Sequence, residues 1–152
     1  MTSRKKSGRR RSRCPLNATI EAFGDGWSLL IVRDLMFKGR TTFKDFLDAE
    51  EGISTNILAD RLEKLEAIGI IARERFPGDA RRIRYRLTKK GLDLAPVLVE
   101  MIVWGARHED TDAPPAAIRR MTGDRERFLA EVRRAWGASQ GRSVRSSGGS
   151  RS

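Results

Sequence analysis

Side chains that could bind a polyanion are concentrated between residues 73 and 90. This stretch holds eight lysine or arginine residues and two acidic ones, a local net charge of +6. Guanidinium groups crowded into a short segment repel one another unless they face a polyanion, and they bind phosphate well. We therefore predict that Arg81, Arg82 and Arg84 contact a phosphate backbone or a minor groove, with an ordinary charged hairpin as the alternative.

A second set of polar side chains lies on one face of a helix predicted within residues 52–71. Its apolar stripe recurs at helical spacing and consists of Leu58, Leu62 and Leu65. Its polar face carries four short side chains: Thr55, Asn56, Ala59 and Asp60. Because short side chains let a helix approach a surface closely, we predict contacts with base edges in a DNA major groove. A solvated helix face is the alternative, and Arg61 and Lys64 either support neighbouring acids or touch phosphate.

Two helix starts and a hairpin surround these side chains. Ser54 can cap the helix just described, and Gly69 follows its end. Upstream, Thr42 with Asp45 three residues later forms a capping box that starts a shorter helix. Downstream, alternating strand patterns flank a Pro-Gly-Asp turn at residues 77–79. Helix, turn, helix and basic hairpin predict a mainly α fold with a small β-hairpin wing, a winged helix-turn-helix.

A long apolar helix is predicted after the hairpin, within residues 88–109. Its charged positions between residues 92 and 107 are spaced seven apart and share one stripe: Asp93, Glu100 and Arg107. We expect a second copy of the chain to cover the rest of its circumference. Pro96 should kink or break the helix. Lys89 and Lys90 fall in its first turn, where the macrodipole disfavours cations, which indicates a nearby phosphate.

Cys14 is the single cysteine, and Pro15 after it is well placed to start a helix. Its sulfur would lie near the positive end of that helix beside Arg13, which favours the thiolate, so Cys14 is a redox-sensing candidate; a partly buried cap residue is the alternative. One cysteine excludes an internal disulfide and a cysteine-based zinc site. His108 is the single histidine, and no catalytic nucleophile, carboxylate pair or phosphate-binding glycine loop is evident. We expect no enzyme activity, no metal site and no cofactor.

The net charge of +11 over 152 residues is concentrated at the two ends. Residues 1–13 carry seven basic residues and residues 138–152 carry three, with no acidic residue in either segment. We expect a disordered basic arm over residues 1–13 and a disordered tail over residues 138–152. Between them we expect a domain over residues 14–108 and a helical extension over residues 109–137. The longest apolar run is too short to span a bilayer, which predicts a cytoplasmic protein with no membrane contact.

Five motifs in register resemble the HxlR-type winged helix-turn-helix transcriptional regulators over about residues 14–108. The motifs are Cys14-Pro15, GDGWSLLIVRDLMFKGRTTFKDF, GISTNILADRLEKLEAIGII, RYRLTKKG and LAPVLVEMIVWG. The resemblance implies a homodimer, joined through its first and last helices, that binds palindromic double-stranded DNA. It also implies a response to electrophiles or oxidants through a cysteine near the N-terminus, the position of Cys14. The chain departs from the family pattern at Gly26, at Arg84 and at Ala80-Arg81.

The combined prediction is a sequence-specific transcriptional regulator, with repression as the expected mode and a small-molecule or electrophile effector. The helix would read the major groove and the hairpin would hold the backbone. The residues assigned to DNA contact are Thr42, Ser54, Thr55, Asn56, Ala59, Asp60, Arg81, Arg82, Arg84 and Lys89. Two alternatives stand beside this prediction: a sequence-independent nucleic-acid binder driven by the basic tails, and a winged helix used for protein contacts alone.

Overall fold

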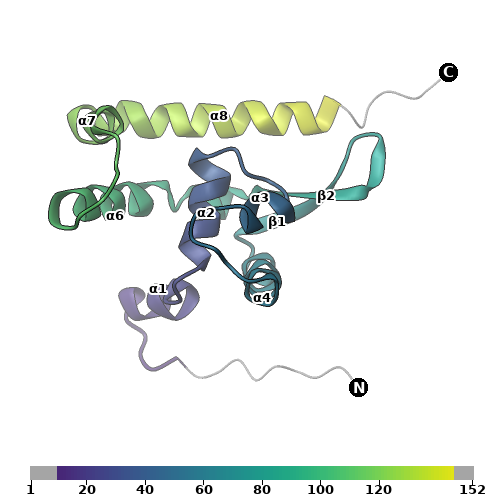
Figure 1. Ribbon diagram of the computed structural model, residues 1–152, viewed down its shortest axis with the longest axis horizontal. Helices are drawn as coiled ribbons and strands as arrows, with labels where there is room; N and C mark the ends of the chain where they lie inside the picture. Colours follow the sequence, from purple (N-terminus) through teal and green to yellow (C-terminus); the bar gives the residue numbers. More distant parts are fainter. Residues whose placement is uncertain (1–9, 146–152) are drawn as a thin grey trace.

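The computed structural model describes residues 10–145, with side chains as far as residue 140 (Figure 1). Its elements, in order, are α1 (Pro15–Phe23), α2 (Ser28–Phe37), α3 (Phe43–Leu47), α4 (Thr55–Ala67), β1 (Ile71–Phe76), β2 (Asp79–Leu87), α5 (Lys89–Leu92), α6 (Ala95–His108), α7 (Pro115–Gly123) and α8 (Arg125–Arg145). Residues 1–9 of the expected arm and residues 146–152 of the expected tail lie outside the described residues.

The predicted helix starts are confirmed at α3 and α4. The Ser54 hydroxyl accepts a hydrogen bond from the Ile57 backbone N–H at 3.3 Å, and Gly69 just beyond α4 has a φ of 78°. Only glycine adopts that left-handed conformation without strain, so the chain leaves the helix there. At α3, the Thr42 hydroxyl accepts from the Asp45 N–H, and the Asp45 carboxylate accepts from the Thr42 N–H. This is the reciprocal capping box that the sequence predicted.

The predicted hairpin is confirmed as a two-stranded antiparallel sheet. Ile71 pairs with Leu87 at the open end, and Glu74 pairs with Arg84 in the middle. A β-bulge shifts the register between Arg75 and Phe76, next to the turn. Together with α3 and α4, the hairpin completes the winged helix-turn-helix layout (Figure 1).

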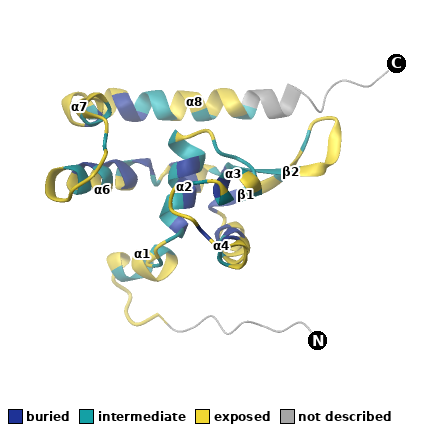
Figure 2. Cartoon of the chain, in the orientation of Figure 1, coloured by how far each residue is buried: buried dark blue, intermediate teal, exposed yellow. Residues whose placement is uncertain are grey.

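The main core lies where α2, α3, α4 and the hairpin meet, and Figure 2 shows buried residues along α2. The α4 side chains Leu58, Leu62 and Leu65 are no more than 2% exposed, as their spacing predicted. They pack in one cluster with Val32 of α2 and Phe46 of α3. The apolar face of α4 therefore points inward, which leaves its polar face to solvent.

The helix predicted after the hairpin is divided into α5 and α6. Pro96 lies in the first turn of α6, which confirms the expected break. One side of α6 is buried against α7 and α8, in a cluster formed by Ala95, Val99, Val103, Met121, Phe128 and Leu129. The expectation that a second copy must cover most of α6 is wrong for this side, because the C-terminal helices cover it within the same chain.

Helix α8 runs antiparallel to α6 and reaches the base of the wing (Figure 1). It continues to Arg145, past residue 137, where we expected the helical extension to end. Two contacts with β2 hold this part of the helix: the Trp136 indole N–H donates to the Leu87 carbonyl at 2.9 Å, and Arg86 donates to Gln140 at 3.1 Å. No helix in the described part of the chain is both long enough and apolar enough to cross a membrane.

Candidate nucleic-acid interface

Helix α4, the second helix of the helix-turn-helix, is the recognition helix of this fold. The polar side chains predicted to read DNA are exposed along its outer face: Ser54, Thr55, Asn56, Ala59 and Asp60. Because those in the first two turns are short, the helix can enter a groove until its backbone lies close to the bases. The structure thus brings the predicted reading residues together on one exposed surface.

Asp60 shares this surface and is paired with two cations of the same helix. Its carboxylate forms ion pairs with Arg61 and with the Lys64 ammonium, the latter at 3.2 Å. The hydrogen bond from Lys64 lowers the pKa of Asp60, so the side chain is an anion at neutral pH. An aspartate can accept a hydrogen bond from cytosine, and its two cationic neighbours offset the repulsion between its charge and the DNA phosphates.

A salt bridge joins the recognition helix to the turn between α1 and α2. Arg61 Nε lies 3.0 Å from the Asp25 carboxylate and forms an ion pair with it. The carboxylate accepts hydrogen bonds from the backbone N–H groups of Trp27 and Ser28 and from the Ser28 hydroxyl. Burial acts to raise the pKa of Asp25, but the hydrogen bonds from Ser28 and Trp27 and the contact with Arg61 lower it to about 2. Of the two roles open to Arg61, the structure shows support of neighbouring acids.

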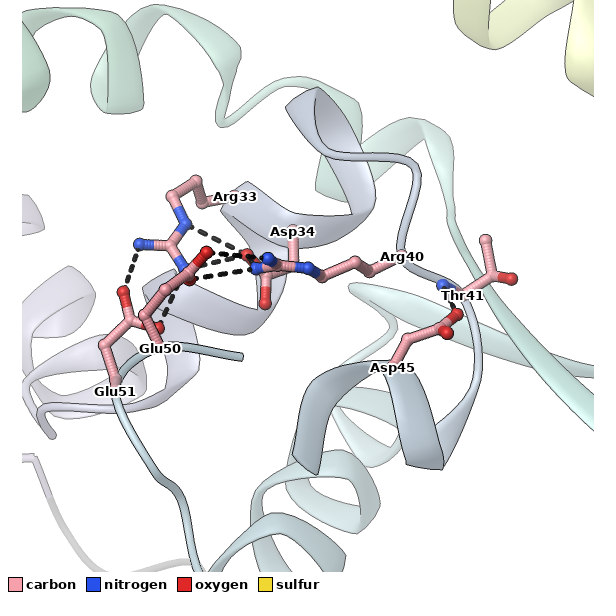
Figure 3. A network of polar contacts seen from close by, with 7 residues as sticks. All are labelled: Arg33, Asp34, Arg40, Thr41, Asp45, Glu50 and Glu51. Carbon is pink, nitrogen blue, oxygen red and sulfur yellow. Dashed lines mark hydrogen bonds and ion pairs between the residues drawn. The ribbon is translucent and has the colours of Figure 1, made fainter. Parts of the chain in front are cut away.

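A charged network holds the loop that leads into the recognition helix (Figure 3). Asp34 of α2 is 3% exposed, and its carboxylate accepts hydrogen bonds from Arg33 at 2.8 Å and from Arg40 at 3.1 Å. Arg33 also donates to Glu51 at 2.6 Å, and Arg40 to Glu50 at 3.0 Å. The two glutamates therefore attach the loop to a buried anion on α2. Sequence reasoning missed this network, because the arginines lie 10 and 18 residues from their glutamates and share no helical or strand spacing with them.

The arginines of the wing fall into two groups. Arg81 and Arg82 are exposed near the turn, and the Arg82 guanidinium lies 4.4 Å from the centre of the Phe76 ring. Arg84 is half-buried, and its Nε donates across the two strands to Glu74 at 2.6 Å. The structure therefore leaves Arg81 and Arg82 facing solvent, whereas Arg84 binds an acid within the hairpin.

Thr42, Lys89 and Lys90 each have a structural partner. The Thr42 hydroxyl caps α3, as described above. The exposed Lys89 pairs with Asp93 at 2.5 Å. The Lys90 ammonium donates to the Ile68 carbonyl at 2.7 Å and so completes the end of the recognition helix, a role that the sequence pattern did not reveal.

Large apolar side chains are exposed on α1 and α6. On α6, Val97, Met101 and Trp104 recur at helical spacing and are 41%, 53% and 59% exposed. On α1, Leu16 and Ile20 are 67% and 47% exposed. The opposite side of α6 is packed against α7 and α8, so this apolar stripe is an additional surface that has no cover within the described residues.

Cys14 occupies the N-cap position of α1, where it is exposed and its side chain makes no capping hydrogen bond. Its sulfur is therefore accessible to reagents in solution. His108 is also exposed, and its ring lies 5.1 Å from that of Trp104. Over residues 10–145 the structure shows no cluster of three His, Cys, Asp or Glu side chains that could hold a metal ion.

Known proteins are similar to this chain in sequence and in fold. A family model described as HxlR-like helix-turn-helix matches residues 22–113. The HTH-type transcriptional regulator sll1512 of Synechocystis sp. is 40% identical over 88 residues, which are 58% of this chain and 64% of that protein, slightly less than two thirds of the relative's length.

Two solved structures of regulators superpose on the chain. The redox regulator HypR in its oxidized form matches with a TM-score of 0.58 and 29% identity, over 64% of this chain and 100% of HypR. The reduced form of the transcriptional regulator YodB from B. subtilis matches with a TM-score of 0.53 and 31% identity, over 64% of this chain and 95% of YodB.

The matched region contains the features on which the site depends. It includes the recognition helix, the wing and the helix α6, while α7 and α8 lie beyond residue 113. The match extends over more than half of the chain and agrees with the regulators named above in both sequence and fold. The family consists of DNA-binding transcription regulators rather than enzymes. The chain belongs to the HxlR-like helix-turn-helix family.

Proposed function

We propose that the protein is a homodimeric repressor that binds a palindromic operator in double-stranded DNA. The observation that carries this proposal is the recognition helix. It exposes Thr55, Asn56 and Ala59 on one face, and it is fixed at its base by Arg61 and at its leading loop by Glu50 and Glu51. A reading element must be held in one orientation for its side chains to select bases, and these contacts supply that restraint.

The two parts of the interface have different tasks in this proposal. The face of α4 reads base edges, with Asn56 able to bond an adenine in a bidentate manner and Thr55 and Ala59 contacting groove atoms. The exposed wing arginines, Arg81 and Arg82, bind phosphate or a minor groove and set the register of the protein on the duplex. The edges of the same proposed interface are formed by Thr42, Ser54, Asp60, Arg84 and Lys89.

A second copy of the chain covers the exposed apolar side chains of α1 and α6 in this proposal. The surface includes Leu16 and Ile20 on α1 and Val97, Met101 and Trp104 on α6. An exposed apolar surface of this kind is typical of an interaction site rather than of a solvated helix. A two-fold axis there would present two recognition helices to successive turns of the major groove, roughly 34 to 36 Å apart, and this geometry requires a palindromic operator.

Regulation through Cys14 is the second part of the proposal. The neighbouring structures include the redox regulator HypR and the quinone-bound form of YodB. With no second cysteine in the chain, the signal would be alkylation, a mixed disulfide with a small thiol, or a bridge between the two Cys14 residues of a dimer. A displacement of α1 would reach the recognition helix through Asp25 and Arg61, and would lower the affinity for the operator. We also propose that the protein acts in the cytoplasm.

A footprint on the DNA beside the protein's own gene tests the proposal. We expect a protected palindrome that competes well against random DNA. The main rival is sequence-independent binding by the basic tails, and it is tested in the full chain by changing the lysines and arginines of residues 1–13 and 138–152 to glutamine. Protection of the palindrome should survive this change, since it depends on the folded domain; loss of all binding would support the rival.

A further inference from the structure

A cavity of about 530 Å³ lies between the wing and the C-terminal helix. Its walls come from the end of α2, from strand β2 and from α8. Figure 1 shows where these three elements lie in the fold. The hydrogen bonds from Trp136 to Leu87 and from Arg86 to Gln140 attach α8 to the wing beside it. Because α8 lies beyond the region shared with the family model, the DNA-binding domain alone does not form this cavity. Its volume falls in the range of sites that hold small molecules.

Part of the cavity wall is apolar. Met36 and Phe37 at the end of α2, Leu92 of α5, and Val132 and Trp136 of α8 line it. Aromatic and long aliphatic side chains of this kind bind a flat apolar body. This apolar part of the wall thus defines the first requirement for a ligand, which is an aromatic or similarly planar hydrocarbon part.

The side formed by the wing is charged. It contains Glu74 with two arginines, Arg84 and Arg86, so these three lining residues carry a net positive charge. Arg84 is held closely by Glu74 at 2.6 Å, whereas Arg86 lies 3.3 Å from the same carboxylate and donates a hydrogen bond to the neutral amide of Gln140. The Arg86 guanidinium is therefore the cation that can turn to an anion at least cost, and its planar fork matches a carboxylate.

We propose that this cavity binds a small molecule with a planar apolar body and one carboxylate, which pairs with Arg86. The ligand would add negative charge at the base of the wing and draw Arg86 away from Gln140. The added negative charge weakens the attraction between the wing and DNA phosphates. This second step rests on the proposed function, and by linkage DNA binding would weaken ligand binding to the same extent.

Calorimetric titration of the full chain with 2-naphthoate, and with neutral 2-naphthamide of nearly the same shape, tests the site. The wild type should bind the carboxylate at least tenfold more tightly than the amide. Arg86→Gln should remove that difference. Ala135→Trp, at an exposed position that lines the cavity, should weaken the binding of both probes at least tenfold. The matched control is Arg134→Gln, an exposed α8 residue that does not line the cavity, and it should bind as the wild type does.

Circular dichroism and thermal melting of each variant show whether it is folded. If Ala135→Trp does not fold, Arg86→Gln alone tests the site. Absence of 2-naphthoate binding to the wild type at millimolar concentration, or equal binding by the wild type and Arg86→Gln, would overturn the site. In a parallel titration, saturating 2-naphthoate should weaken operator binding several-fold in the wild type and not in Ala135→Trp. Unchanged operator binding would overturn the link to the wing. A chain that binds 2-naphthoate through Arg86 but selects no operator would support the site and contradict the proposed function.

Discussion

Arg61 Nε lies 3.0 Å from the Asp25 carboxylate, so the recognition helix is attached directly to the turn that ends α1. The carboxylate is fixed in turn by backbone N–H groups at the start of α2. Cys14 lies at the other end of α1, a helix of nine residues. One ion pair therefore connects the helix that carries the exposed thiol with the helix that we propose reads DNA.

Asp25→Asn should destabilise the protein at neutral pH and flatten its acid dependence. The folded-state pKa of Asp25, about 2, lies below the ordinary value of 3.8, so its ionised form stabilises the fold above about pH 4. This contribution is lost as the pH falls through the folded-state pKa, and we expect about 1 kcal/mol after screening by solvent. Urea unfolding of both proteins between pH 6 and pH 2.5 measures it, with Glu63→Gln as a surface control. A difference between wild type and Asp25→Asn that does not shrink in acid would contradict the assignment.

Met101→Asp should produce a folded monomer, because the side chain is 53% exposed on the stripe that we propose a second copy covers. Val99→Asp, two residues earlier on the same helix, should instead unfold the protein, since Val99 is fully buried and a lone buried charge costs several kcal/mol. Sedimentation and circular dichroism separate the two effects. A wild type that sediments as a monomer at about 10 μM would contradict the proposed dimer and the palindromic operator that we infer from it.

Cys14→Ser should make operator binding insensitive to diamide and to quinones, while binding before treatment stays close to that of the wild type. The reason is that Cys14 is the single thiol in the chain, it is exposed, and its side chain makes no capping hydrogen bond that the substitution would remove. Mass spectrometry after treatment identifies the adduct, and a gel shift measures binding. An equal response from both proteins, or none from either, would show that Cys14 does not carry the signal.

Changing Arg81 and Arg82 together to glutamine should weaken binding to every DNA sequence by a similar factor. If both contact phosphate, the slope of log affinity against log salt should fall by about one to two per subunit. The matched control removes two exposed arginines from the C-terminal helices, Arg119 and Arg133. A salt slope that is unchanged in the wing variant, or changed equally in the control, would place the phosphate contacts elsewhere.

Local sequence signals predicted most of the DNA-binding fold. The capping residues Thr42 and Ser54, the glycine after α4 and the leucine spacing act within one or two helical turns, so the sequence alone defines α3, α4 and the break at Pro96. Those same signals placed the exposed face of α4 and the exposed arginines of the wing.

Contacts between distant residues were not predictable in this way. The Asp34 network, the Asp25 to Arg61 pair and the contact of Lys90 with the Ile68 carbonyl join residues that share no periodicity. The burial of Val99 depends on α7 and α8, whose amphipathic pattern did not indicate where they would pack. These contacts hold the recognition helix in place. The sequence therefore predicted the exposed residues of the candidate site but not the contacts that hold them in position.

Asn56→Ala tests the proposed function most directly. It removes one side chain that we propose reads a base, and it leaves in place the leucine core, the Asp25 to Arg61 pair and the Asp34 network. The measurement is the affinity of wild type and variant for the footprinted operator and for random DNA, at one salt concentration. We expect the variant to lose about 1 to 3 kcal/mol per half-site on the operator and almost nothing on random DNA, since base contacts specify and phosphate contacts position. Equal losses on both DNAs, or no loss on the operator, would contradict the assignment of α4 as the reading helix.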